Sequence, residues 1–90
     1  MTIMFVRHHV ADYDAWRRVY DGVGDMQRQA GVTEAAVYRA EDDPNGVLVM
    51  HRFASSAEAQ SFMENPDLRQ AMADAGVDPS TLRAEFYTEA

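Results

Sequence analysis

The chain has 90 residues, 47% of them hydrophobic and 26% charged, and a formal net charge of −7 from 15 acidic and 8 basic residues. This length fits one small domain over residues 1–90, and an acidic chain without a basic cluster does not favour binding to nucleic acid or to an anionic membrane. Cysteine and lysine are absent, which excludes thiol and Schiff-base chemistry. We expect a cytoplasmic protein, because no apolar run approaches the length of a membrane span and the first residues resemble a strand rather than a signal peptide.

The first part of the chain predicts a strand, a long helix and a second strand. Residues 2–10 alternate as a strand that is apolar on both faces in its first half. Asp12 is placed to cap a helix that runs to about Ala30, and Gly31 is placed to end it. The helix has one apolar stripe, made of Tyr13, Trp16, Val19, Tyr20, Val23, Met26 and Ala30. Residues 32–40 then form a strand.

The second part repeats this order after a turn. Residues 42–46, Asp-Asp-Pro-Asn-Gly, are turn formers, so the strand predicted over residues 47–53 closes a β-hairpin with residues 32–40. Ser55 and Glu58 have the spacing of a capping box. The helix that they begin is interrupted near Pro66 and continues to Gly76. The last strand is predicted over residues 81–89, after a loop at residues 78–80.

The order of elements predicts an α+β, ferredoxin-like split βαββαβ fold. Its four-stranded antiparallel sheet has the first and third strands at the centre and both helical segments on one face. The central strands are apolar on both sides, with Ile3 and Phe5 opposite Met4 and Val6. Helices can cover only one of these sets, so we expect a homodimer that packs through the helix-free sheet face. The alternative is an apolar face that remains exposed.

Several segments carry a resemblance to a known family. They are Val6-Arg7-His8-His9-Val10-Ala11-Asp12-Tyr13-Asp14-Ala15-Trp16-Arg17-Arg18-Val19-Tyr20-Asp21, Gly31-Val32, Tyr38-Arg39, Asp43-Pro44-Asn45 and Phe53. With these segments the chain resembles the antibiotic biosynthesis monooxygenase superfamily of small dimeric α+β barrel proteins, over nearly its whole length. The resemblance implies a ligand pocket within each protomer, between the sheet and the helices.

The resemblance also implies a range of functions. The superfamily contains cofactor-independent oxygenases of polyketide quinols, haem-degrading oxygenases and members without known activity. The first expectation is a cofactor-independent monooxygenase, or a cyclase or isomerase, that needs no cofactor and acts on a small aromatic or polyketide-like molecule. The alternative is a non-catalytic dimer that binds a small ligand or serves as a scaffold. Haem chemistry fits poorly, because residues 56–75 contain no histidine where haem-degrading members supply their iron ligand.

His51 is the candidate catalytic residue among the three histidines. His8 and His9 are adjacent in a strand and point to opposite faces, and a sensible register leaves His9 and His51 about 13 Å apart, so we expect no metal site. His51 shares its face with Val49 and Phe53, and a shielded neutral imidazole can accept a proton from a bound quinol. The structural alternative is a buried histidine that is hydrogen-bonded within the fold.

Six side chains are candidates for binding a small hydrophobic or aromatic ligand: Arg7, His9, Trp16, Tyr20, Phe53 and Phe62. Arg7 is expected beside His51, where it could hold an anionic group, although a salt bridge to Glu85 or Glu34 is the preferred interpretation. The aromatic residues could instead fill the core. A cavity of about a few hundred Å³ beside His51 or Tyr20 would favour an enzyme, and a filled core would favour a scaffold.

Overall fold

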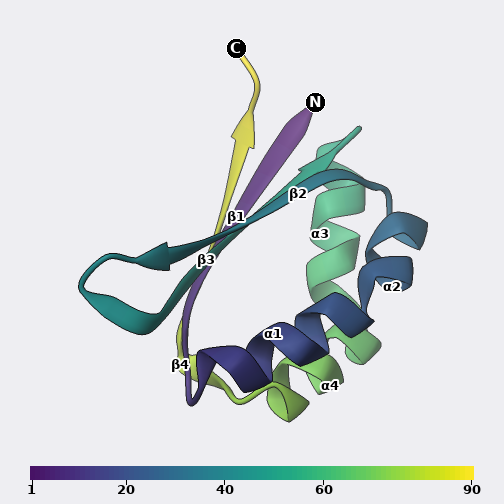
Figure 1. The fold of residues 1–90 in the computed structure, drawn as a ribbon. Coiled ribbons are helices and arrows are strands. Elements are labelled where there is room, and N and C mark those ends of the chain that lie inside the picture. The colour runs from purple at the N-terminus through teal and green to yellow at the C-terminus, as the bar shows by residue number, and fades with distance from the viewer.

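The computed structural model describes residues 1–90. It contains, in chain order, β1 (Thr2–Val10), α1 (Tyr13–Gly22), α2 (Gly24–Gln29), β2 (Val32–Ala40), β3 (Asp43–Phe53), α3 (Ser56–Glu64), α4 (Pro66–Asp74) and β4 (Val77–Thr88). The sheet order is β2-β3-β1-β4, and every neighbouring pair is antiparallel. The four helices lie on one side of this sheet (Figure 1). The predicted ferredoxin-like fold is therefore confirmed, and none of its helices is long and apolar enough to cross a membrane.

The long helix predicted after Asp12 is in fact two helices. Asp12 caps α1 as expected, because its carboxylate accepts a hydrogen bond from the backbone N–H of Ala15. The helix stops at Val23, whose backbone leaves the helical region with φ −103° and ψ 16°. Glycines flank Val23 on both sides and each weakens a helix, so the apolar stripe continues across a break instead of a straight helix.

The predicted break in the second helical segment is present. Ser55 caps α3 through a hydrogen bond to the backbone N–H of Glu58. Asn65 then ends α3 and caps α4, and Pro66 occupies the first turn of α4, where its missing N–H costs nothing. No residue of α4 is buried, so this helix is held less firmly than α1 or α3.

Two predicted loops lie inside strands. The hairpin turn is at residues 41–42, because Ala40 already pairs with Asp43, and the turn formers after Asp43 form a bulge at the start of β3. Likewise Asp78 pairs with His9, so the loop expected at residues 78–80 is a bulge within β4. The Asp43 carboxylate accepts a hydrogen bond from the Asn45 N–H, and the Asp78 carboxylate accepts one from the Ser80 N–H. These bonds favour the local turns over a regular ladder.

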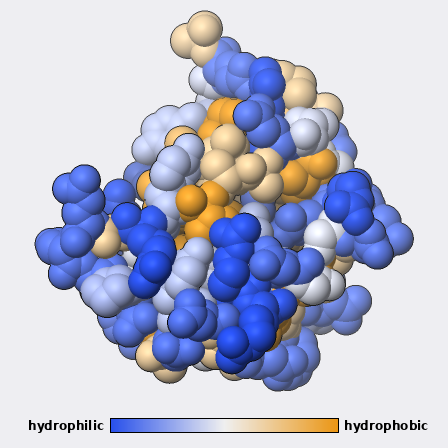
Figure 2. All heavy atoms as spheres, in the orientation of Figure 1, coloured by the Kyte–Doolittle hydropathy of each residue, from blue (hydrophilic) through white to orange (hydrophobic).

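The pairing also decides which face of the sheet meets the helices. Two clusters of buried hydrophobic residues lie under the helices: Met4, Val6, Phe53, Ala59 and Phe62, and Val10, Trp16, Val47, Val49 and Ala75. The opposite face carries Ile3, Phe5, Leu48 and Met50, which are only half-buried. Figure 2 shows hydrophobic residues gathered in the upper half of the molecule, in the area that the strands cross in Figure 1, above a mostly hydrophilic lower half.

Candidate functional site

A small cavity lies between the sheet and the helices. Its volume is about 60 Å³, and its lining is apolar except for Tyr20, Gln27 and His51. About 10–15 Å³ of such space is enough to hold one water molecule, so the cavity suits a few waters or a dioxygen molecule. A benzene-sized ring needs about 150 Å³ and a drug-sized ligand about 300 Å³ or more, so an aromatic ligand can enter only if the walls move apart.

Tyr20 and His51 form the polar centre of this cavity. The Tyr20 hydroxyl lies 3.0 Å from Nε2 of His51, and the two rings are nearly parallel, with centroids 6.1 Å apart. Tyr20 comes from α1, on the stripe that faces the sheet, while His51 comes from the central strand β3, where it pairs with Met4. The contact therefore joins the helix layer to the middle of the sheet.

His51 is neutral at physiological pH. Its residue is 4% exposed, and burial lowers the pKa of its imidazole to about 4. Nδ1 has no hydrogen-bond partner, and the edges of the ring meet Phe53 and Phe62. When Tyr20 donates its hydroxyl hydrogen, Nε2 is the acceptor and the imidazole hydrogen resides on Nδ1. A neutral ring in this form can take up a proton at Nε2.

Tyr20 remains protonated in the same surroundings. Burial raises the pKa of its phenol, and the nearby Gln27 side chain and Arg17 only partly oppose that effect. On its other side Tyr20 stacks on Trp16, with centroids 4.9 Å apart and an angle of 23° between the rings. The Tyr20 ring is therefore held between Trp16 and His51, with its hydroxyl at the cavity.

The predicted ligand-binding residues divide into three groups. Tyr20 and Phe62 line the cavity together with His51. Trp16 and Phe53 are buried at 3% and 0% exposure but do not line it, so they support the cavity from the core. Their roles in ligand binding, like that of His51, remain predictions.

Arg7 and His9 lie on the other face of the sheet. Arg7 pairs with Leu48 and is exposed, so its predicted position beside His51 is wrong, because the residues that neighbour His51 on β1 belong to the Met4 set. The salt bridge preferred for Arg7 is not formed either, since Glu34 pairs with Arg52. Arg7 and His9 are two residues apart in β1 and therefore share a face. Matching the wrong face of β1 to the His51 face of β3 misplaced both residues.

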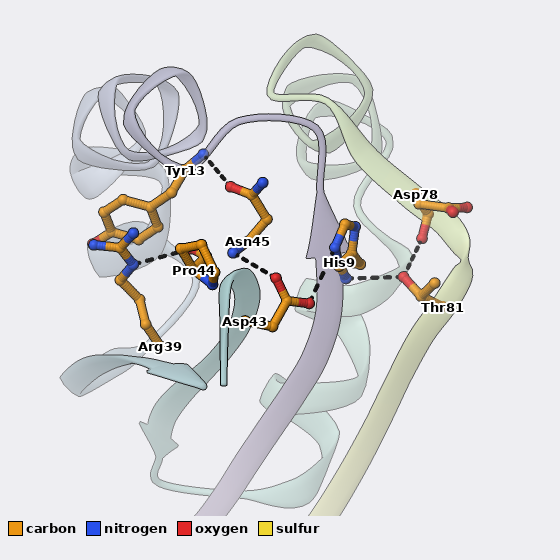
Figure 3. A network of polar contacts seen from close by, with 8 residues as sticks. All are labelled: His9, Tyr13, Arg39, Asp43, Pro44, Asn45, Asp78 and Thr81. Atoms are coloured by element: carbon orange, nitrogen blue, oxygen red, sulfur yellow. Dashed lines mark hydrogen bonds and ion pairs between the residues drawn. The ribbon is translucent and has the colours of Figure 1, made fainter. Parts of the chain in front are cut away.

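His9 belongs to a polar network at the far end of β1 (Figure 3). Its Nε2 lies 3.2 Å from a carboxylate oxygen of Asp43, and its backbone N–H donates to the Thr81 hydroxyl. The Asn45 side chain extends the network to the backbone N–H of Tyr13 at the start of α1. These contacts connect β1, β3, β4 and α1, and they explain His9 as a structural residue at the surface.

The family of the chain follows from a sequence comparison that agrees with this geometry. The model of the antibiotic biosynthesis monooxygenase family, ABM, matches residues 3–74. The chain belongs to this family. The matched range includes Tyr20, His51 and every other residue that lines the cavity except Ala75. No curated protein sequence matches the chain.

Solved structures support the ABM fold. SnoaB, a cofactor-independent oxygenase from Streptomyces nogalater, is 13% identical, with a TM-score of 0.77 over 99% of this chain and 93% of that chain. A candidate antibiotic biosynthesis monooxygenase from Bordetella bronchiseptica is 9% identical, with a TM-score of 0.78 over 99% and 97% of the two chains. Another from Deinococcus radiodurans is 15% identical, with a TM-score of 0.75 over 100% and 93%. At these identities the likeness concerns the fold.

Two buried polar residues of this ABM protein escaped the sequence analysis. Gln27 is 8% exposed and lines the cavity. It follows Tyr20 by seven residues, a helical spacing that places both on one face, and this was a usable signal. His8 is 5% exposed and lies against Trp16, and neither of its ring nitrogens has a partner. Its alternation with Met4 and Val6 would have predicted its burial once the helix-covered face was known.

Proposed function

We propose that this ABM protein is a cofactor-independent monooxygenase that acts on a small phenolic or quinol-type aromatic compound. The observation that supports this best is the contact between the Tyr20 hydroxyl and the neutral His51 imidazole at the wall of an otherwise apolar cavity. Such a site offers one proton acceptor, a dry environment and no other reactive group, which suits a reaction in which the substrate supplies the electrons.

The chemistry begins with removal of the substrate's phenolic proton. The substrate hydroxyl donates its hydrogen to the Tyr20 oxygen while the Tyr20 hydrogen moves to Nε2 of His51, so the phenol becomes a phenolate and His51 becomes an imidazolium. Dioxygen then adds at the carbon para to the phenolate oxygen, and the peroxide anion takes the proton back from His51. The resulting hydroperoxide loses water, with the hydrogen of the para carbon, to give a quinone. The balance is one phenol plus one dioxygen to one quinone plus one water, so no external reductant is needed.

The low basicity of His51 restricts the substrate. Its pKa of about 4 lies about six units below that of a simple phenol, and six units correspond to about 8 kcal/mol. Attraction between imidazolium and phenolate in a buried site recovers part of this difference. Substrates with an acidified hydroxyl, such as naphthols and larger fused phenols, therefore fit better than phenol itself.

A second function is favoured by the cavity volume. Because about 60 Å³ cannot hold an aromatic ring, a non-catalytic small-ligand binder or a scaffold dimer also agrees with the structure. The two functions differ in turnover. A binder is stabilised by a ligand without consuming oxygen, whereas the proposed enzyme converts it.

The test is a panel of naphthols and quinols under isotopically labelled dioxygen, with a chelator present and without added flavin, metal or haem. We expect at least one compound to raise the melting temperature and to yield a quinone that carries one labelled oxygen atom. Oxygen uptake and quinone should appear in a 1:1 ratio, without hydrogen peroxide. Binding without oxygen uptake for every compound would refute the enzyme and support the binder.

We also propose that the protein is a homodimer. The helix-free face combines half-buried Ile3, Phe5, Leu48 and Met50 at its centre, and an apolar patch of this kind usually marks an interface. Tyr38 is 52% exposed and Tyr87 is 50% exposed, which leaves two large aromatic rings for contact with a partner. Two copies that pack sheet to sheet would cover this face in an isologous interface.

A further inference from the structure

A second and larger hollow lies beside the inner cavity. It is a surface groove of about 420 Å³ between α4 and β4, lined by Met63, Arg69, Met72, Ala73, Val77, Pro79 and Leu82. Met63 and Met72 line both the groove and the inner cavity, so these two side chains are the wall between them. The groove has the volume of a small-molecule site, which the inner cavity lacks.

The Met63 and Met72 side chains, which separate the groove from the inner cavity, can change position. Methionine side chains are unbranched and repack easily. Met63 lies near the end of α3 and Met72 lies on α4, and the two helices meet at the break before Pro66. α4 has no fully buried residue, so a shift of this helix uncovers half-buried side chains, Leu68, Ala71 and Met72, rather than a buried core.

The groove also carries one unpaired positive charge. Arg69 is exposed, and none of the ion pairs of the chain involves it. Arg7, Arg18, Arg39 and Arg83 also form no ion pair, but Arg69 is the arginine that lines the groove, where the other lining residues are uncharged. A guanidinium binds carboxylate, sulfonate or phenolate groups through paired hydrogen bonds.

We propose that the groove between α4 and β4 is the entrance to the inner cavity, and that it selects aromatic ligands that carry an anionic group. Met63 and Met72 are the movable wall, and Arg69 binds the anion at the rim. The inference rests on the proposed function for the ligand class, since it takes the inner cavity as the place where the aromatic ring arrives.

Two fluorescent probes test this selection, because they share an aromatic body and differ in charge. They are 8-anilinonaphthalene-1-sulfonate, an anion, and N-phenyl-1-naphthylamine, its neutral counterpart. We expect Arg69→Gln to weaken binding of the anion by about fivefold and to change binding of the neutral probe less than about twofold. Arg18→Gln, at an exposed arginine of α1 outside both hollows, should change neither. Equal effects of Arg69→Gln on both probes, or no effect, would overturn the anion selectivity.

A groove-filling variant tests the route. Ala73 is exposed on α4 and lines only the groove, so Ala73→Trp should weaken both probes by about tenfold or more. Gln60→Trp places the same side chain on the exposed side of α3, outside both hollows, and should leave binding unchanged. Unchanged binding in Ala73→Trp would overturn the groove as the entrance.

Methyl NMR of the methionines reports how far the anionic probe travels. Signals of Met63 and Met72 should shift first, Met4 should shift when the ring reaches the inner cavity, and Met50 on the opposite sheet face should not move. A shift of Met4 in the Ala73→Trp variant at unchanged affinity refutes this route. Quinone formation from neutral naphthols, together with unchanged probe binding in Arg69→Gln, would refute this inference and leave the proposed function standing. Selective binding of the anionic probe without any turnover would refute only the proposed enzymatic function.

Discussion

Lowering the pH from 7 to 4 should destabilise the folded protein through His8 and His51. Burial lowers the pKa of each imidazole to about 4, from 6.5 in an accessible histidine. Between the pKa of the folded state and that of the unfolded state, the unfolded chain binds more protons than the folded chain. The free energy of unfolding therefore falls as the pH falls. Below pH 4 both states are protonated and the loss from these two residues is complete.

The size of the effect follows from the shifts. Each histidine shifts by about 2.5 units, which corresponds to about 3 kcal/mol at a full proton difference. Two histidines therefore account for about 6 kcal/mol, a large part of the 5–15 kcal/mol that stabilises a typical domain. Asp78, whose pKa is lowered by hydrogen bonds from Ser80, adds its own loss only near and below the usual range for aspartate.

Urea unfolding at a fixed protein concentration, at pH 7, 6, 5 and 4.5, measures this dependence. The matched variant is His8→Leu, which removes one titrating group whose ring nitrogens have no partner. It should stabilise the protein at pH 7 by about 1–3 kcal/mol and halve the slope with pH. A His8→Leu variant with the wild-type slope would refute the reasoning.

Three further predictions concern the site, the interface and the fold. Tyr20→Phe should leave Nε2 of His51 without its hydrogen-bond partner. We expect the free energy of unfolding in urea to fall by about 1–3 kcal/mol and turnover to slow by about tenfold or more. Unchanged turnover would show that Tyr20 is not on the proton path. Leu48→Glu should give a folded monomer in sedimentation, whereas Met4→Glu, at a residue that is 1% exposed, should unfold the chain. A dimeric Leu48→Glu variant would exclude the helix-free face as the interface. Gly31→Ala should cost about 1–2 kcal/mol in urea unfolding, because Gly31 has φ +102° and its new Cβ would meet Glu58; wild-type stability would show that the loop relaxes freely.

The order and pairing of the strands could be predicted because local signals agreed with one another. The caps at Asp12 and Ser55, the break at Pro66 and the end at Gly31 all lie where the sequence placed them. The predictions that failed concern competition between local preferences. The turn formers at residues 42–46 predict the hairpin turn there, whereas in the structure Asp43 already pairs with Ala40 and the segment after it forms a bulge that continues the strand.

The position of the site was harder to predict, because both faces of β1 are apolar and either could have packed against the helices. Ile3 and Phe5 are as apolar as Met4 and Val6, so the central residues did not decide it. The end of the strand held the missing signal: Arg7 follows the first set and belongs on the more exposed side. His51 was found as a candidate because it lies in an apolar strand, but its contact with Tyr20 depends on the register of β3 and the rotation of α1, which short-range patterns do not specify.

The measurement that tests the central claim most directly compares two histidine variants in the same assay. Oxygen uptake and quinone formation are followed with the best naphthol of the panel for wild type, His51→Ala and His9→Ala, after thermal melting has shown that each variant is folded. The account predicts that His51→Ala still binds the naphthol but loses turnover by about 100-fold or more, while His9→Ala keeps the wild-type rate. Equal turnover in wild type and His51→Ala would contradict the account.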